Sequence, residues 1–494
     1  MVAISTSAPT RIGCPASVVV AGLVALTLVR FAVAGALNLT DDEAYYRLWS
    51  FSLDFGYYDH APMVAWIMRA GRSLVGDTSL GLRLFAPVMA LVGSLTLWRT
   101  AAILFGTSRA GTAVLWYNAT ALVAIGSIVT TPDTPSVFFW GATLWALAEL
   151  DRSRNANWWL VVGLTSGLCL LSKYSGLFLG AGIVLWILWL PENRRWLLSW
   201  QLWLGGLIAV AMFVPVIVWN AEHNWVSFAK QFGRAVVHDL TPTAPLELIG
   251  TTAGLLSGLI VPFVVWGTAL ALGAGRTDRT VRNAVLPLAT SLPFALYLLQ
   301  HSLHGHVEAN WPAPLFQGAV LLAVAPLSRV ADLAPSRRAM ADWLRRWTGP
   351  FGIVLGLLVY LHALYPIWIL SSRVDPTSQT RGWDQFAEEI DQRAREVGAE
   401  WIAGPNYAIT AQLIRRLGTD RVLQPTERDR YSFLPPPASD IWQKPALYLA
   451  RSWHPEATRV GTLFRSVERL PDMARTQNGR VVEPYAVFKV SGLR

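Results

Sequence analysis

Charged residues are scarce in this chain, and their scarcity decides its class. Asp, Glu, Lys and Arg make up only 15% of the 494 residues, whereas a typical soluble domain carries about 25%. Hydrophobic residues make up 53%, and 24 residues are Trp, whose amphipathic ring suits the membrane–water interface. The composition therefore excludes an ordinary soluble protein and predicts a membrane protein.

Cysteine is almost absent. Cys14 and Cys169 both lie in or beside apolar segments, so the chain offers neither a disulfide framework nor a cysteine metal site. The net charge of +9 would suggest a nucleic-acid partner in a soluble protein. Here the basic residues gather in short loops between apolar runs, so membrane topology explains them and no nucleic-acid partner is expected.

A clear cleavage site is also missing near the N-terminus. Arg11 precedes the apolar run Ala16–Leu28, as in a signal peptide, but no small-residue cleavage motif follows it. More apolar runs come later, so a retained signal anchor is the better interpretation.

Long apolar runs are abundant. A membrane-spanning helix needs about 20 predominantly apolar residues, and the sequence predicts eleven such segments. They lie near residues 16–37, 82–105, 109–129, 134–150, 157–172, 175–191, 202–220, 246–272, 283–300, 313–328 and 349–370.

Arginines fall in alternate loops between these runs. If the N-terminus is cytoplasmic, the cytoplasmic loops hold Arg109, Arg152, Arg154, Arg194, Arg195, Arg276, Arg279, Arg282, Arg329, Arg337, Arg338, Arg345 and Arg346. The opposite loops are poor in Lys and Arg, and the loop at 301–312 has none. This alternation follows the positive-inside rule, and an odd number of spans places the C-terminal segment outside.

The C-terminal segment, 371–494, has a different pattern from residues 1–370. Charge rises, and we expect helices at Trp383–Val397 and Ala408–Leu417. Short buried strands are expected at Trp401–Ala403, Ala446–Leu449 and Ala486–Val490. The sequence therefore predicts an all-α polytopic membrane domain, 1–370, followed by a small soluble α/β domain.

The first outward loop, 38–81, begins with three consecutive acids at 41–43. Charges next to a span are costly if they enter the bilayer, so they suggest a functional site. The alternative is a solvated loop or a helix cap, with Thr40 or Asp41 capping the run Glu43–Phe51. That run and Pro62–Val75 are amphipathic but too short to span, so we expect both to lie along the interface.

The other outward loops also carry ionisable residues. Asp133 stands between two prolines and can be a helix cap, whereas Lys173 can snorkel to the interface or hold a phosphate. Asn220–Leu240 resembles a basic interfacial helix. His301, His304, His306 and Glu308 could bind a metal. Because all these clusters fall on one side of the membrane, they predict one extracytoplasmic cavity.

Five motifs stand in a fixed order: Asp-Glu-Ala-Tyr-Tyr at 42–46, Tyr-Asp-His-Ala-Pro at 58–62, Thr-Pro-Asp at 131–133, Lys-Tyr at 173–174 and Val-Glu-Ala-Asn-Trp-Pro-Ala-Pro at 307–314. This order resembles the bacterial branch of the dolichyl-phosphate-mannose protein mannosyltransferase family. The same superfamily includes the aminoarabinose transferases of lipid A, and its fold is called GT-C. The resemblance covers about residues 15–325, and Gly-Pro-Asn-Tyr at 404–407 resembles this branch weakly.

The resemblance implies a GT-C fold and an inverting, nucleotide-independent transfer of sugar from a polyprenyl-phosphate carrier. The acceptor would be lipid A, another glycan or a protein outside the cytoplasm. The protein would be a multi-pass protein of a bacterial inner membrane, with its active site and C-terminal domain in the periplasm. The sugar is left open among mannose, galactose, galacturonic acid and aminoarabinose.

The resemblance also assigns roles to residues. Asp42 would be the catalytic carboxylate, with Asp41 as a rival, and Asp133 would be a second acid near the acceptor or the reacting centre. Lys173 would hold the donor phosphate, a role that suits a cation because the leaving phosphate needs positive charge.

Two positions depart from the family pattern. Asp59 and His60 stand where relatives carry an acid and a Lys, so the phosphate contact of that Lys is in doubt; Tyr45 replaces an Arg. The donor-binding residues expected are Lys173, Tyr174, His60, Tyr45 and Glu43, and the substrate-lining residues expected are Tyr46, Tyr58, Glu308, Asn310 and Trp311. Asp59 is the metal-ligand candidate that the resemblance implies, and a divalent metal ion is the candidate cofactor.

Two other functions fit a polytopic membrane protein. The first is a transporter or flippase for a lipid-linked sugar, but transporters tend to show internal repeats and broken polar helices at mid-membrane. The second is a carrier-binding subunit without activity. Here the polar residues collect at one face of the membrane, which favours an interfacial enzyme.

Overall fold

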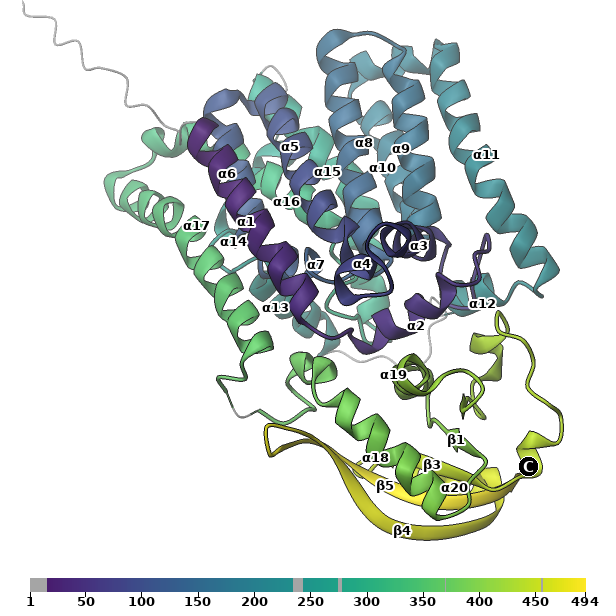
Figure 1. Ribbon diagram of the computed structural model, residues 1–494. Helices are drawn as coiled ribbons and strands as arrows, with labels where there is room; N and C mark the ends of the chain where they lie inside the picture. Colours follow the sequence, from purple (N-terminus) through teal and green to yellow (C-terminus); the bar gives the residue numbers. More distant parts are fainter. Residues whose placement is uncertain (1–15, 234–242, 274–277, 369, 455) are drawn as a thin grey trace, which may run out of the picture.

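The computed structural model describes residues 16–233, 243–273, 278–368, 370–454 and 456–494. Arg11, Cys14, Arg276 and the end of the expected helix Asn220–Leu240 therefore lie outside the described residues. A bundle of helices extends to Leu364, and a sheet with its own helices follows it (Figure 1).

The helices up to Leu364 include long straight ones and short ones. They are α1 (Ala16–Ala36), α2 (Asp41–Trp49), α3 (Met63–Val75), α4 (Ser79–Arg83), α5 (Phe85–Phe105), α6 (Thr107–Asn118), α7 (Ala121–Gly126), α8 (Asp133–Ser153), α9 (Trp158–Ser172), α10 (Gly176–Trp189), η1 (Pro191–Leu198), α11 (Trp200–Glu222), α12 (Val226–Gly233), α13 (Ala244–Leu255), α14 (Val261–Leu272), α15 (Arg279–Ser302), α16 (Leu315–Val324), η2 (Ala325–Asp332) and α17 (Pro335–Leu364).

The expected count of eleven spans is not reproduced. All eleven apolar runs fall on helices, but within the described residues only six helices are long and apolar enough to cross a membrane. A seventh is reached if α10 and η1, which meet at a bend of 114°, form one span. The sequence therefore located the apolar helices correctly and misjudged their continuity.

One of the remaining runs, 134–150, lies on the continuous 21-residue helix α8, which is long enough but not apolar enough to count. Others are short or interrupted for local reasons. The run 109–129 is interrupted because the Thr120 side chain caps α7. The run 246–272 is interrupted at Ser257 and Gly258, which both have positive φ. The helix α9 has 15 residues, below the usual spanning length.

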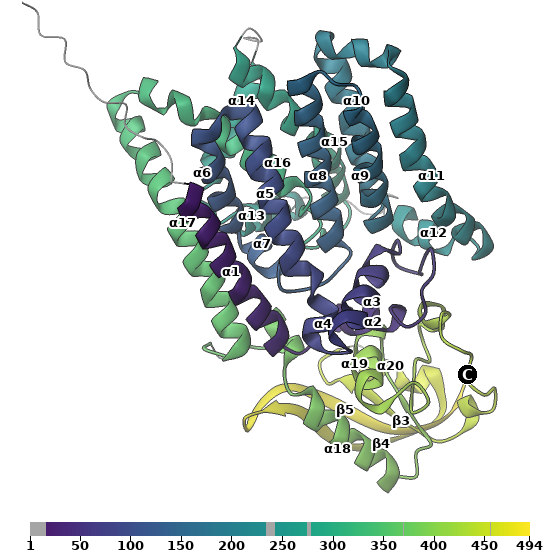
Figure 2. The same cartoon turned by 45° about the horizontal axis from the view of Figure 1, so that its top comes forward.

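Helices α2 and α3 form as the sequence predicts. A capping box closes the start of α2, where the Thr40 side chain accepts from the Glu43 N–H and the Glu43 carboxylate accepts from the Thr40 N–H. Helix α3 spans Met63–Val75, within one residue of the expected range. Both helices, with α4, lie between the helical bundle and the C-terminal part of the chain (Figure 2).

The C-terminal part carries a five-stranded sheet in the order β2-β1-β3-β5-β4. Strand β1 pairs in parallel with β2 and β3, and β5 pairs antiparallel with β3 and β4. Its elements are η3 (Pro376–Thr380), α18 (Trp383–Glu396), β1 (Trp401–Ala403), α19 (Tyr407–Leu417), β2 (Val422–Leu423), η4 (Arg428–Tyr431), η5 (Ile441–Gln443), β3 (Ala446–Arg451), α20 (Glu456–Leu463), β4 (Phe464–Gln477) and β5 (Arg480–Leu493).

The five C-terminal elements expected from the sequence are all present, but β2 and β4 were missed. Strand β4 lies at the edge of the sheet, and half of its 14 residues are exposed, so it shows no buried alternation. The pairing of β4 with β5 also shifts between Leu470 and Met473, where Pro471 cannot donate a ladder hydrogen bond.

The C-terminal part packs directly on α2. Helix α19 contacts α2, and one hydrophobic cluster combines Tyr45 and Trp49 of α2 with Trp383 of α18 and Leu413 of α19. This shared core fixes the position of the sheet domain against the start of α2.

Candidate active site

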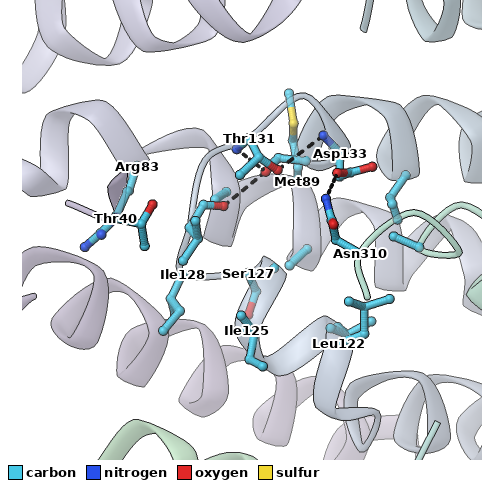
Figure 3. Close-up of a pocket in the computed structure, with 18 of the residues that line it drawn as sticks. Thr40, Arg83, Met89, Leu122, Ile125, Ser127, Ile128, Thr131, Asp133 and Asn310 are labelled. Atoms are coloured by element: carbon cyan, nitrogen blue, oxygen red, sulfur yellow. Dashed lines mark hydrogen bonds between the residues drawn. The ribbon is translucent and has the colours of Figure 1, made fainter. Parts of the chain in front are cut away.

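A cavity of about 410 Å³ opens beside the start of α2. Its wall is mostly apolar, and its polar lining includes Asp42, Asp133 and Asn310. Figure 3 shows Asn310 reaching toward Asp133 across the loop that precedes α8. The apolar lining includes Leu37, Met89, Leu122, Ile125, Ile128, Val129, Phe138 and Val359.

Among the described residues, Asp42 is one of the two carboxylates that line this cavity. Its Oδ1 accepts a hydrogen bond of 2.8 Å from the hydroxyl of Tyr407, at the start of α19. Burial raises the pKa of Asp42 to about 6, although the bond from Tyr407 opposes the rise. A carboxylate with this pKa can accept a proton near neutral pH.

Asp41, the rival, has a different environment. Its carboxylate accepts from Gln412 at 3.1 Å and lies 3.4 Å from Arg451. Burial raises its pKa, but Asp41 is not among the residues that line the cavity. Between the two acids, the geometry favours Asp42 for the reacting position.

Asp133 and Lys173 form an ion pair at the edge of the cavity. The Lys173 Nζ lies 2.6 Å from Asp133 Oδ1, and Asn310 donates to Asp133 Oδ2 at 2.6 Å. Three segments that are distant in the sequence therefore meet at one carboxylate. Lys173 carries a positive charge beside the cavity, but its amine is already paired.

Glu43 lies behind the cavity rather than in it. Its fully buried carboxylate pairs with the fully buried Arg83 at 2.6 Å. It also accepts from the backbone N–H of Thr130 at 2.8 Å. We expected Glu43 to bind the donor, and its contacts suit a residue that positions α2 instead.

Asp59 is surrounded by cations. Lys230 Nζ lies 2.6 Å away and Arg430 Nη1 3.1 Å away, while the hydroxyl of Tyr45 donates to the same carboxylate at 3.1 Å. This environment repels a divalent cation. Across the described ranges, no group of three or more His, Cys, Asp or Glu, including His301, His304 and His306, is placed to hold a metal ion.

The other expected residues lie at different depths. Tyr46 is buried with its ring centroid 6.0 Å from that of His60, and Tyr58 lies under Lys230 in a second, polar pocket.

Tyr174 hydrogen-bonds Ser227 within an aromatic cluster. Glu308 is exposed, and Trp311 packs near His301 at 5.3 Å between ring centroids.

Several residues at the site were not assigned from the sequence. Tyr407, Gln412, Arg430 and Arg451 all come from the C-terminal part and contact the acids at 41, 42 and 59. The motif Gly-Pro-Asn-Tyr at 404–407 was the one available signal, and it indicated no role. A contact between residues more than 350 positions apart has no local signature.

Comparisons with known proteins found one family model and several similar proteins. The model of the dolichyl-phosphate-mannose-protein mannosyltransferase family matches residues 59–219. The lipid A galacturonosyltransferase RgtD of Rhizobium johnstonii is 27% identical over 392 residues, covering 76% of this chain and 77% of RgtD.

Two crystal structures of ArnT from Cupriavidus metallidurans, in the apo state and bound to undecaprenyl phosphate, each match with a TM-score of 0.64. Each match covers 96% of this chain and 98% of ArnT. Because the sequence identity is 17%, the match shows a shared fold. The resemblance indicated by the five motifs is thus confirmed, and the protein has the fold of the GT-C glycosyltransferases.

Proposed function

We propose that the protein is a glycosyltransferase that takes a sugar from a polyprenyl-phosphate carrier and transfers it to an acceptor outside the cytoplasm. The observation that carries this proposal is Asp42, an enclosed carboxylate with a raised pKa at the edge of a mostly apolar cavity. The similarity to RgtD makes a galacturonic acid donor and a lipid A acceptor the first candidates to test.

The residues suit a single displacement with inversion. Asp42 takes the proton of the acceptor hydroxyl as that oxygen attacks the anomeric carbon. The bond from the anomeric carbon to the phosphate oxygen breaks, and the carrier phosphate leaves with the electron pair. Lys173, beside Asp133, supplies positive charge toward the departing phosphate.

Tyr407 orients the base in this scheme. Burial and the neighbouring Asp42 raise the pKa of Tyr407, so its hydroxyl stays protonated and donates to Oδ1. The second oxygen of Asp42 is then the one offered to the acceptor. Asp133 and Asn310, on the same cavity wall, are placed to contact the incoming substrate.

The wall of the cavity favours a lipid-linked substrate. Apart from the polar groups named above, its lining is largely aliphatic, and burial of an acyl or isoprenoid chain on such a wall is favourable. We place the protein in a bacterial inner membrane as a multi-pass protein. Residues 1–370 form its transmembrane domain, and 371–494 form a periplasmic domain.

A donor panel tests the proposal. The purified protein is assayed with synthetic undecaprenyl-phosphate sugars and a lipid A acceptor, beside Asp42→Asn and the surface control Asp384→Asn. Loss of a general base lowers turnover by about 10²- to 10⁴-fold, so we expect Asp42→Asn to lose that much while still binding donor, and the control to keep its rate.

Two outcomes contradict parts of the proposal. Full turnover in Asp42→Asn would move the base to Asp41 or Asp133. Absence of transfer with every donor, together with movement of a labelled lipid-linked sugar across proteoliposomes, would replace the enzyme by a flippase.

A further inference from the structure

An arginine cluster lies on the far side of α2 from the cavity. It consists of Arg47 on α2, Arg69 and Arg72 on α3, and Arg415 and Arg416 on α19. Asp77, between α3 and α4, pairs with Arg47, and the charges of Arg415 and Arg72 also act on its carboxylate. Arg416 pairs with the exposed Asp384. Five positive charges thus face two negative charges.

The positive charges of the clustered arginines repel one another. Burial and the charges of Arg416 and Arg47 lower the pKa of Arg415 to about 10. Burial and the charge of Arg69 likewise lower the pKa of Arg72. In the part of the chain that the structure describes, the buried Nη1 of Arg415 has no hydrogen-bond partner. A buried guanidinium nitrogen without an acceptor is costly, so an anion that approaches Arg415 would stabilise the cluster.

Exposed apolar side chains border the cluster. Phe51 is 52% exposed and Leu74 is 71% exposed. The guanidinium carbon of Arg72 lies 3.4 Å from the centroid of the Phe51 ring, and that of Arg47 lies 4.8 Å from it. Basic residues beside apolar ones on a short amphipathic helix are typical of a surface that lies in lipid head groups.

We propose that the arginine cluster is a binding site for the phosphate of an anionic phospholipid in the leaflet next to α3. The guanidinium groups of Arg72 and Arg415 donate to the phosphate oxygens. Phe51 and Leu74 insert beside the acyl chains. The lipid joins α3 to α19 and so steadies the C-terminal domain against the start of α2. This site makes no use of the sugar-transfer chemistry.

Reconstitution in nanodiscs tests the site. The protein is placed in phosphatidylcholine alone or in phosphatidylcholine with phosphatidylglycerol, and Tm is measured at low and high salt. We expect phosphatidylglycerol to raise the wild-type Tm by about 3 °C, through preferential binding to the folded state, and high salt to reduce the gain. Native mass spectrometry should show phosphatidylglycerol retained on the protein.

Two variants and a control decide the outcome. Arg72→Gln and Arg415→Gln should lose the gain and the retained lipid, while their Tm in phosphatidylcholine alone reports whether they fold. Arg393→Gln, a surface change of equal charge on α18, should keep both. An equal gain in all four proteins, or none in the wild type, overturns the site. Since Tm and lipid retention need no turnover, either result is independent of the proposed enzyme activity.

Discussion

Asp42 is subject to two opposing influences on its pKa. Burial raises the pKa to about 6, and the hydrogen bond from Tyr407 lowers it. A base acts when it is deprotonated, so kcat/KM should rise with pH through a midpoint near 6. Tyr407→Phe removes the bond that favours the carboxylate, and a bond of this kind corresponds to about one pH unit. We therefore expect the midpoint of the variant to lie about one unit higher.

The pH profile separates this role from a structural one. If Tyr407 merely held α19 in place, Tyr407→Phe would lower the rate without moving the midpoint. The profile is measured on purified wild type and variant with the donor that the wild type uses. An unchanged midpoint would remove Tyr407 from the proposed mechanism.

The ionised carboxylate of Asp42 should also lower the stability of the folded protein. The folded protein holds a proton on Asp42 up to a pKa of about 6, whereas the ordinary value is 3.8. The stability gained from this bound proton is present in full below pH 3.8 and is lost as the pH rises through 6. Asp42→Asn should therefore raise Tm at pH 7.5, and the gain should vanish near pH 4. A gain that is the same at both pH values would contradict the raised pKa.

At the scale of elements, one ion pair fastens α2 to its neighbours. Arg83 pairs with Glu43 and donates to the carbonyls of Ala34, Leu37 and Asn38 at the end of α1. Both partners are fully buried, so removal of one leaves the other uncompensated.

Arg83→Met should therefore destabilise the protein by about 3–5 kcal/mol, measured as the free energy of unfolding in detergent with added denaturant. The matched control is Arg338→Met, which breaks an exposed pair with Asp342 at 3.9 Å and should cost about 0.5 kcal/mol or less. Equal losses of unfolding free energy in the two variants would show that the buried pair stabilises the protein no more than the exposed pair does.

Local signals account for the elements that the sequence located. The capping box at Thr40 and Glu43 and the apolar runs act over three to four residues, so they can be seen in the sequence. The break at Ser257 and Gly258 and the edge strand β4 have weak local signals. Their conformations depend on the neighbours they pack against, which is why the spans were counted as continuous and β4 was missed.

At the scale of the molecule, the proposed topology can be tested by labelling. In a background without the two native cysteines, Asp440→Cys in the C-terminal domain should react with a membrane-impermeant maleimide in cells with a permeabilised outer membrane. Arg337→Cys, at the start of α17, should react only after the inner membrane is broken, because the positive-inside rule places its loop in the cytoplasm. The reverse pattern would invert the topology.

The sequence could predict only half of the site. Asp42, Asp133, Lys173 and Asn310 stand in motifs of the outward loops, and the structure brings them to one cavity edge. Tyr407 belongs to a separate segment whose docking depends on the buried surface shared by α2, α18 and α19. Such docking depends on packing across the whole chain, which no spacing of residues records.

The bond between Asp42 and Tyr407 has a consequence for biosynthesis. Asp42 leaves the ribosome 365 residues before Tyr407, and Asp41 leaves it 410 residues before Arg451. The helical bundle can therefore insert long before the acids acquire their partners. A chain arrested before the sheet domain would occupy the membrane with an unoriented base, so each molecule becomes competent only after its sheet domain has been made and has docked.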